Sequence, residues 1–131
     1  MGETIEAGGL KFFVEDRTVG EDGGPSMQVL ATIEGKEVQL LRFDMFHKGP
    51  HYHYDPNGTN LRYDLDPLVL EGDGVHWTMK FFGDNLSRVL AKTGYEKALA
   101  RIDRGDVFLE LPVIEHAWKA QSPASRPLNT A

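Results

Sequence analysis

The chain has 131 residues, of which 40% are hydrophobic and 26% are charged, and this length and composition fit one folded domain with a buried core. The formal net charge is −6, and lysine and arginine are spread along the chain, which excludes a strongly cationic surface and predicts no nucleic-acid partner. The absence of cysteine excludes disulfides, thiolate metal sites and a cysteine nucleophile.

The sequence predicts a cytoplasmic location. The segment Met1 to Glu6 is acidic and lacks the apolar core of a signal peptide. No apolar run approaches the ~20 residues of a membrane span, so no membrane partner is predicted. We expect a single α+β domain over residues 1–120. Residues 121–131, rich in serine, proline and alanine, are expected to form a disordered tail.

The first half of the chain has the alternation of β-strands. Residues 10–14 are a predicted strand, and the glycine-rich, acidic segment 19–26 a predicted loop. Residues 27–34 and 37–46 flank Gly35-Lys36, which is typical of a β-hairpin with a two-residue turn. That turn sets a register in which Val29 faces Arg42 and Met27 faces Asp44.

A second hairpin is predicted around Asp55-Pro56-Asn57-Gly58, whose residues all favour turns. If Tyr54 pairs with Thr59, His53 faces Asn60 and His51 faces Arg62. Alternation then gives the hairpin two different faces. One face carries the imidazoles with polar partners, namely His51, His53, Asn60, Arg62 and Asp64. The other face carries mainly phenol rings, and its residues are Tyr52, Tyr54, Leu61, Tyr63 and Leu65.

The second half of the chain is predicted to be mainly helical. Residues 75–92 favour one helix with Asp73 at its N-cap and Gly94 just beyond its end, although the alternation up to Phe82 also fits a strand. Beyond it we expect a short helix at 95–102, a last strand at 107–111, and a helix opened by Pro112 that reaches residue 119 or 120. The predicted fold class is therefore α+β, an antiparallel sheet of hairpins with about four to six strands packed against two or three C-terminal helices.

Three of the five histidines lie close together in the sequence, at His47, His51 and His53. On a strand, a His-x-His pair places both imidazoles on one face, about 6–7 Å apart. These histidines are candidate ligands of a divalent metal, zinc or iron, with Asp44 or Asp64 as the alternative to His47 for the third ligand. The competing interpretation is a polar face whose histidines contact solvent or make structural hydrogen bonds.

Further candidate ligand-binding residues come from the same two hairpins. Arg42 could neutralise an anionic ligand, and Asp44 could orient a ligand histidine. The other candidates are Tyr52, Arg62 and Asp64, although Tyr52 also fits a packing role. An arginine opposite His51 counts against a metal there, because a cation beside the ligand repels the ion.

Two resemblances can be traced in these residues. The His51-x-His53 pair resembles the first motif of the cupin barrels, but the positions where that family has a glutamate ligand hold Asn57 and Gly58. The segment from residue 40 to about residue 103 resembles small uncharacterised bacterial domains, a resemblance that implies no function.

Three functional hypotheses follow. The first is a small, soluble bacterial-type domain without an assigned reaction, which acts by binding a protein partner or by forming a homodimer. The second is a metal-binding protein or metal-dependent enzyme that uses the histidine cluster. The third is a pH switch in which the same histidines become charged together. The sequence leaves open whether the protein is an enzyme.

Overall fold

The structure is a computed structural model that describes residues 2–122. Its strands are β1 (Glu3–Ala7), β2 (Leu10–Val19), β3 (Asp22–Ile33), β4 (Lys36–Asp44), β5 (His51–Tyr54) and β6 (Leu61–Asp64). Its helices are the 3-10 helix η1 (Pro67–Leu70) and the α-helices α1 (Gly74–Asp84), α2 (Leu86–Lys92), α3 (Glu96–Leu99) and α4 (Arg104–Gln121). The tail predicted at 121–131 lies, apart from its first two residues, outside the described residues.

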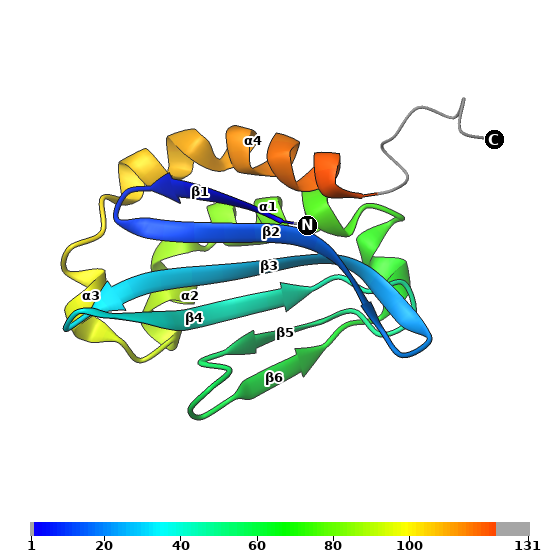
Figure 1. Ribbon diagram of the computed structural model, residues 1–131, viewed down its shortest axis with the longest axis horizontal. Helices are drawn as coiled ribbons and strands as arrows, with labels where there is room; N and C mark the ends of the chain where they lie inside the picture. Colours follow the sequence, from blue (N-terminus) through cyan, green and yellow to red (C-terminus); the bar gives the residue numbers. More distant parts are fainter. Residues whose placement is uncertain (1, 123–131) are drawn as a thin grey trace.

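The six strands form one antiparallel sheet in the order β1-β2-β3-β4-β5-β6, so every strand pairs with its neighbour in the sequence (Figure 1). The helices follow the last strand, which confirms the predicted α+β class. β1 and β6 are the two edges, and the sheet is therefore open rather than closed into a barrel like that of the cupins. In the described part of the chain, no helix is long and apolar enough to cross a membrane.

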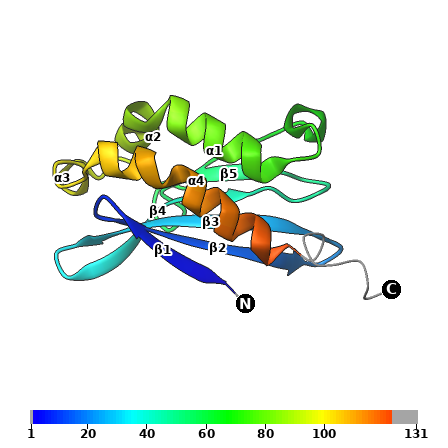
Figure 2. The same cartoon turned by 90° about the horizontal axis from the view of Figure 1, so that it is seen from above.

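The helices α1, α2 and α4 cover one face of the sheet (Figure 2). This face is built from two apolar rows that run across the strands: Val14, Met27, Phe43, Tyr52 and Tyr63, and Phe12, Val29, Leu41, Tyr54 and Leu61. Phe43 contacts the rings of Phe81 and Phe82 on α1, with centroids 6.3 Å away in both cases. Burial of these rings and aliphatic side chains supplies the main driving force for folding.

None of the helices in residues 2–122 lies on the opposite face, which carries mainly polar residues of the same strands. One row crosses the strands as Glu15, Ser26, Asp44, His51 and Asp64, and the next as Phe13, Gln28, Arg42, His53 and Arg62. Because side chains alternate along a strand, these rows lie opposite the apolar ones. The sheet thus separates the polar cluster from the hydrophobic core.

The N-terminal prediction was incomplete. β1 was missed, and the predicted loop at 19–26 is mostly strand, because β2 runs to Val19 and β3 already begins at Asp22. Gly24, at φ +149°, makes this possible: a Cβ there would lie 2.8 Å from the carbonyl oxygen of Met45, so only glycine lets β3 approach the end of β4 this closely.

The predicted register of the first hairpin was wrong. The turn is Glu34-Gly35, both at positive φ, and a β-bulge at Val29/Leu30 shifts the pairing once more. Asp44 therefore pairs with Ser26 rather than with Met27. The sequence did not indicate this turn, because a non-glycine residue such as Glu34 rarely adopts positive φ.

The second hairpin has the predicted turn but a longer loop. The carbonyl of Asp55 accepts the N–H of Gly58 at 3.1 Å and that of Asn60 at 2.7 Å. His53 consequently pairs with Arg62, and His51 pairs with Asp64, not with Arg62 as predicted. The register moves by two residues, so each side chain stays on its predicted face and the separation of imidazoles from phenols is confirmed.

The single helix predicted for residues 75–92 is interrupted, and the strand alternative up to Phe82 was wrong. α1 begins with the predicted cap, since Asp73 accepts the backbone N–H of His76 at 2.9 Å. The break lies at Asn85, whose side-chain amide donates to the carbonyl of Phe81 at 2.9 Å. The backbone N–H of Asn85 donates to the same carbonyl at 3.2 Å, and at φ −126° Asn85 leaves the helical conformation, so α1 ends here.

The strand predicted at 107–111 was also wrong, and Pro112 does not open a helix. Both lie inside α4, whose buried residues follow the helical period: Val107, Leu111, Ile114, Ala117 and Trp118. A window of five residues is too short to distinguish this period from strand alternation. The proline is tolerated in mid-helix although it removes a backbone donor.

Candidate metal centre

The candidate site lies on the helix-free face, where β4 and β5 run side by side. Asp44 pairs with His51, and Arg42 pairs with His53. Asp44, His51 and His53 are all buried, with exposed fractions of 1%, 7% and 5%. Their burial is contrary to the solvent-facing part of the competing interpretation, whereas the other part, histidines that make structural hydrogen bonds, is compatible with it.

The two imidazoles converge on one carboxylate oxygen. Nε2 of His51 lies 3.2 Å from Oδ2 of Asp44, and Nε2 of His53 lies 3.8 Å from the same atom. One potential ligand atom from each of these three residues lies within 4.8 Å of the other two. Within residues 2–122, this is the one group of three or more His, Asp or Glu side chains with a geometry suited to a shared ion.

Both imidazoles are oriented by an oxygen on their far side. Nδ1 of His51 lies 2.8 Å from the carbonyl of Gly49, and Nδ1 of His53 lies 2.7 Å from Oδ1 of Asn60. Since these oxygens accept hydrogen bonds, each Nδ1 carries the proton and donates. Nε2 of each ring then faces Asp44, where it can donate to the carboxylate when protonated or act as a metal ligand when it is not.

The Asp44 carboxylate is held by hydrogen bonds that still leave one direction open. Oδ1 accepts from the hydroxyl of Ser26 at 2.7 Å and from Nη1 of Arg17 at 3.4 Å. Oδ2 accepts from Nε of Arg42 at 2.9 Å, which uses one of its two lone pairs. The other lone pair of Oδ2 is the one available toward the imidazoles.

These contacts keep Asp44 ionised. Burial alone would raise the pKa of Asp44, but the hydrogen bonds from His51 and Ser26 and the charge of Arg42 together hold that pKa well below its ordinary value. The pKa of His53 is lowered, first by burial, which outweighs the hydrogen bond to Asn60. An anionic carboxylate beside a neutral imidazole is the protonation state that a metal ligand set requires.

The loop before β5 is pinned in place by Asp22. Its carboxylate accepts the backbone N–H groups of Gly23, Lys48 and Gly49 at 2.8, 3.0 and 2.9 Å. Burial would raise the pKa of Asp22, but these three donors hold it below its usual value. The fixed loop places the carbonyl of Gly49 against His51 Nδ1.

Residues 4–117 match the model of a family described as a domain of unknown function, DUF7700. The chain belongs to this family. The match begins in β1 and ends in α4, so it includes the whole Asp44, His51 and His53 cluster. No curated protein matches the chain, and no solved structure matches it.

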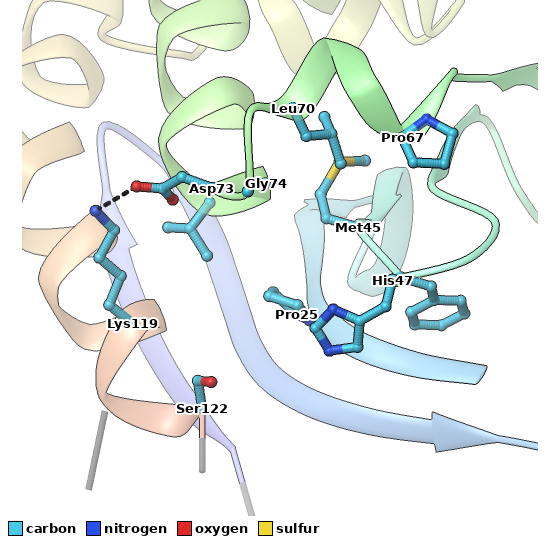
Figure 3. A pocket seen from close by; sticks show the side chains of 12 residues that line it. Pro25, Met45, His47, Pro67, Leu70, Asp73, Gly74, Lys119 and Ser122 are labelled. Atoms are coloured by element: carbon cyan, nitrogen blue, oxygen red, sulfur yellow. Dashed lines mark hydrogen bonds and ion pairs between the residues drawn. The ribbon is translucent and has the colours of Figure 1, made fainter. Parts of the chain in front are cut away.

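His47, predicted as a third ligand, is not part of the cluster in this DUF7700 domain. Its side chain is exposed and lines a separate pocket of about 440 Å³ beside the N-terminus of α1 (Figure 3). There it lies across from the ion pair between Asp73 and Lys119, whose atoms are 3.1 Å apart. The ring of Phe46, which also lines this pocket, packs edge-on against His51.

The remaining candidate ligand-binding residues lie outside the cluster: Arg62 and Asp64 are at the edge of the helix-free face, and Tyr52 is on the helix-covered face. Arg62 and Asp64 are exposed and pair with each other at 2.8 Å. Their row positions are beside His53 and His51, but neither contacts the cluster in the described structure. Tyr52 stacks on Phe43 and Tyr63 on the helix-covered face, as the packing interpretation of this residue expects.

Sequence reasoning did not single out four residues that shape the site in this DUF7700 domain. Ser26 and Arg17 reach Asp44 from β3 and β2, Asn60 reaches His53 from the turn, and Asp22 fixes the loop. Asn60 had a signal, since it was placed on the imidazole face of the hairpin. The others depend on a register that the bulge in β3 conceals.

Proposed function

We propose that this DUF7700 domain binds one divalent cation, zinc or iron(II), through Asp44, His51 and His53. The observation that supports the proposal is that three potential ligand atoms lie within 4.8 Å of one another. They are Oδ2 of Asp44 and Nε2 of each histidine, and each of these side chains is held by a further hydrogen bond.

The spacing supports this proposal. Ligands about 2.1 Å from a tetrahedral ion lie about 3.4 Å from one another. The two N–O separations, 3.2 and 3.8 Å, lie on either side of that value. Small side-chain rotations are therefore enough to place both nitrogens at bonding distance from one ion.

Three protein ligands leave at least one position of the ion open. Two histidines and a carboxylate with an open position suit zinc-dependent hydrolysis and non-haem iron chemistry. The proposal extends to metal binding with an open position and assigns no reaction. We also propose a cytoplasmic location, because the chain has no cysteine for the disulfides of oxidising compartments.

The alternative occupant of this spot is a proton. A lone pair on His51 Nε2 directed at a carboxylate oxygen 3.2 Å away is repulsive, so either a proton or a cation must lie between them. Nη2 of Arg42 also lies 3.4 Å from Nε2 of His53, the same separation as between Arg17 and Asp44, and a bound metal has to displace this contact. Metal titration distinguishes the two occupants.

The test is equilibrium dialysis of the metal-free protein against Zn²⁺ and Co²⁺. We expect one ion per chain, and an affinity at least about a hundredfold lower in each of His51→Ala and His53→Ala, since second-shell changes alone cost 10–100-fold. His47→Ala is the matched control and should bind as the wild type does. Equal binding in all four proteins, with circular dichroism showing that each is folded, would rule out the centre.

We also propose self-association as a second function, through an exposed apolar stripe on α4. Phe108, Leu109 and Val113 are 56%, 74% and 52% exposed. The phenylalanines of the sheet and of the segment after β4 do not offer a comparable surface, because Phe12, Phe43 and Phe46 are buried and Phe13 is partly buried. The helix stripe is thus the surface that favours a homodimer.

A further inference from the structure

We propose that the candidate metal centre binds a small oxyanion, a carboxylate or phosphate group, that bridges the ion and Arg17. This inference rests on the proposed metal site and names the class of ligand that fills its open position. It is carried by the charges around Asp44, by the unused donors of Arg17 and by the access to the site from the helix-free face.

Two arginines contact the single carboxylate of the candidate ligand set. Arg17 and Arg42 both form ion pairs with Asp44, whereas Glu15 lies on the same row beyond Ser26, and no ion pair joins it to either arginine within residues 2–122. Positive charge is therefore already in excess beside Asp44 before a cation binds. The exposed Arg62–Asp64 pair beside them adds no net charge.

A divalent cation at this position adds two further positive charges without a partner, close to buried groups. Unbalanced charge at a partly buried site is costly, because the surrounding medium screens it less than water does. A bound oxyanion offsets that excess. The metal and the anion should therefore each bind with higher affinity when the other is present.

Arg17 has donors to spare for such an anion. In the part of the chain that the structure describes, its guanidinium makes one hydrogen bond, the 3.4 Å contact with Oδ1 of Asp44. A guanidinium has five N–H donors in a planar fork that matches the two oxygens of a carboxylate or phosphate. The remaining donors are available to a ligand beside the ion.

A small ligand can reach this position. The side chains of Arg17 and Arg42 are 33% and 27% exposed, whereas that of Asp44 is 1% exposed. No helix covers this face of the sheet (Figure 2). The arginines therefore form the boundary between the buried ligand set and solvent, where an incoming anion meets them first.

The test uses the Co²⁺-loaded protein, whose visible absorption reports the ligands of the ion. Inorganic phosphate and sodium acetate are titrated separately, at constant ionic strength set with sodium perchlorate. We expect at least one of the two anions to shift the spectrum saturably, and the one that binds more tightly identifies the oxyanion class. Arg17→Gln, compared at saturating Co²⁺, should weaken that anion at least about tenfold, and Arg17→Lys should weaken it less because it keeps the charge.

The control is Arg101→Gln, which removes an exposed arginine outside the site and should leave anion affinity unchanged. A Co²⁺ spectrum that neither anion alters overturns the oxyanion inference and leaves the metal site standing. Equal anion affinity in wild type and Arg17→Gln also overturns it. Failure to bind Co²⁺ at all instead removes the proposed function, and the inference with it.

Discussion

Single residues differ in how they hold the two imidazoles. His51 is oriented by a main-chain carbonyl, that of Gly49, whereas His53 is oriented by the side chain of Asn60. Only the second contact can be removed by a substitution that leaves the backbone in place. Asn60 is exposed, so its replacement creates no cavity in the core.

The first prediction concerns this contact. Asn60→Ala should lower the affinity for Zn²⁺ about 10–100-fold, because the ring of His53 loses the acceptor that fixes its tautomer and orientation. The thermal unfolding temperature should fall by a few degrees, because Asn60 has φ +50°, a conformation that asparagine adopts more readily than alanine. Isothermal titration measures the affinity, and Asn57→Ala, at an exposed asparagine of the same turn, is the control. A metal affinity equal in the two variants would contradict this role of Asn60.

At this scale the sequence located the members of the candidate cluster better than the residues that support them. The His-x-His spacing and the alternation of the second hairpin brought His51 and His53 to one face, and Asp44 was already a candidate ligand. His47, also a candidate, lies outside the cluster in the described structure, because closeness in sequence says little once the chain leaves the strand. The role of Ser26 could not be predicted from the sequence, since its pairing with Asp44 depends on the β-bulge.

Among the elements, the turn between β5 and β6 is tied to the start of α3. The hydroxyl of Tyr95 donates to Oδ1 of Asp55 at 2.5 Å, and Thr59 donates to Oδ2 of the same carboxylate through its backbone N–H at 2.8 Å. The hydrogen bond from Tyr95, followed by those from Thr59, lowers the pKa of Asp55, and the same bond raises the pKa of Tyr95. This contact joins segments that are 40 residues apart in the chain.

The second prediction follows from the signs of these shifts. Because the folded state lowers the pKa of Asp55, its stabilisation is present above the ordinary carboxyl pKa and is lost as pH falls through the lower, folded value. Because the folded state raises the pKa of Tyr95, the same bond is lost as pH rises through that raised value. Tyr95→Phe should therefore lower the free energy of unfolding by about 1–2 kcal/mol at pH 7.

Urea denaturation at several pH values measures this difference. The gap between wild type and Tyr95→Phe should be full at pH 7 and shrink below about pH 4 and above about pH 10. The control is Tyr63→Phe, because the hydroxyl of Tyr63 has no hydrogen-bond partner in the described structure. A gap that stays constant from pH 3 to pH 11 would show that Asp55 and Tyr95 are not linked.

The elements themselves were predictable where a local signal was strong. Turn residues at Asp55–Gly58 and the cap at Asp73 located a hairpin and a helix start correctly. α4 was not predicted as one helix, because Pro112 suggested that a helix starts there. The buried positions on both sides of the proline instead belong to a single helix that packs on β1 and β2. Tertiary packing of that apolar face outweighed the local cost of the proline.

For the whole molecule, the two sides of the sheet have different roles. The helix-covered face holds the hydrophobic core. The helix-free face holds the polar cluster of Asp44, His51 and His53, which is buried by neighbouring polar and aromatic side chains. The overall α+β arrangement was predicted because hairpins preceding helices leave few other topologies. The surface of α4 could not be predicted, because residues 107–111 were assigned to a strand and a helix was expected only from Pro112 onward.

The third prediction concerns that surface. If the α4 stripe joins two copies, light scattering should give twice the chain mass of 14.7 kDa, and Leu109→Lys should give the single-chain mass. The physical reason is that a charged side chain cannot be buried in an apolar contact without a partner. Leu68→Lys, at an apolar residue of η1 that is 83% exposed, is the control and should remain dimeric. A single-chain mass for the wild-type protein would contradict this surface as a dimer interface.

The most direct test of the central claim is a crystal structure of the zinc-loaded protein, with anomalous scattering measured on both sides of the zinc absorption edge. Our account predicts one anomalous peak per chain about 2.0–2.2 Å from Oδ2 of Asp44 and from Nε2 of both histidines. A zinc peak elsewhere, or no anomalous signal at the cluster with Nε2 of His51 within hydrogen-bond distance of Oδ2 of Asp44, would contradict it.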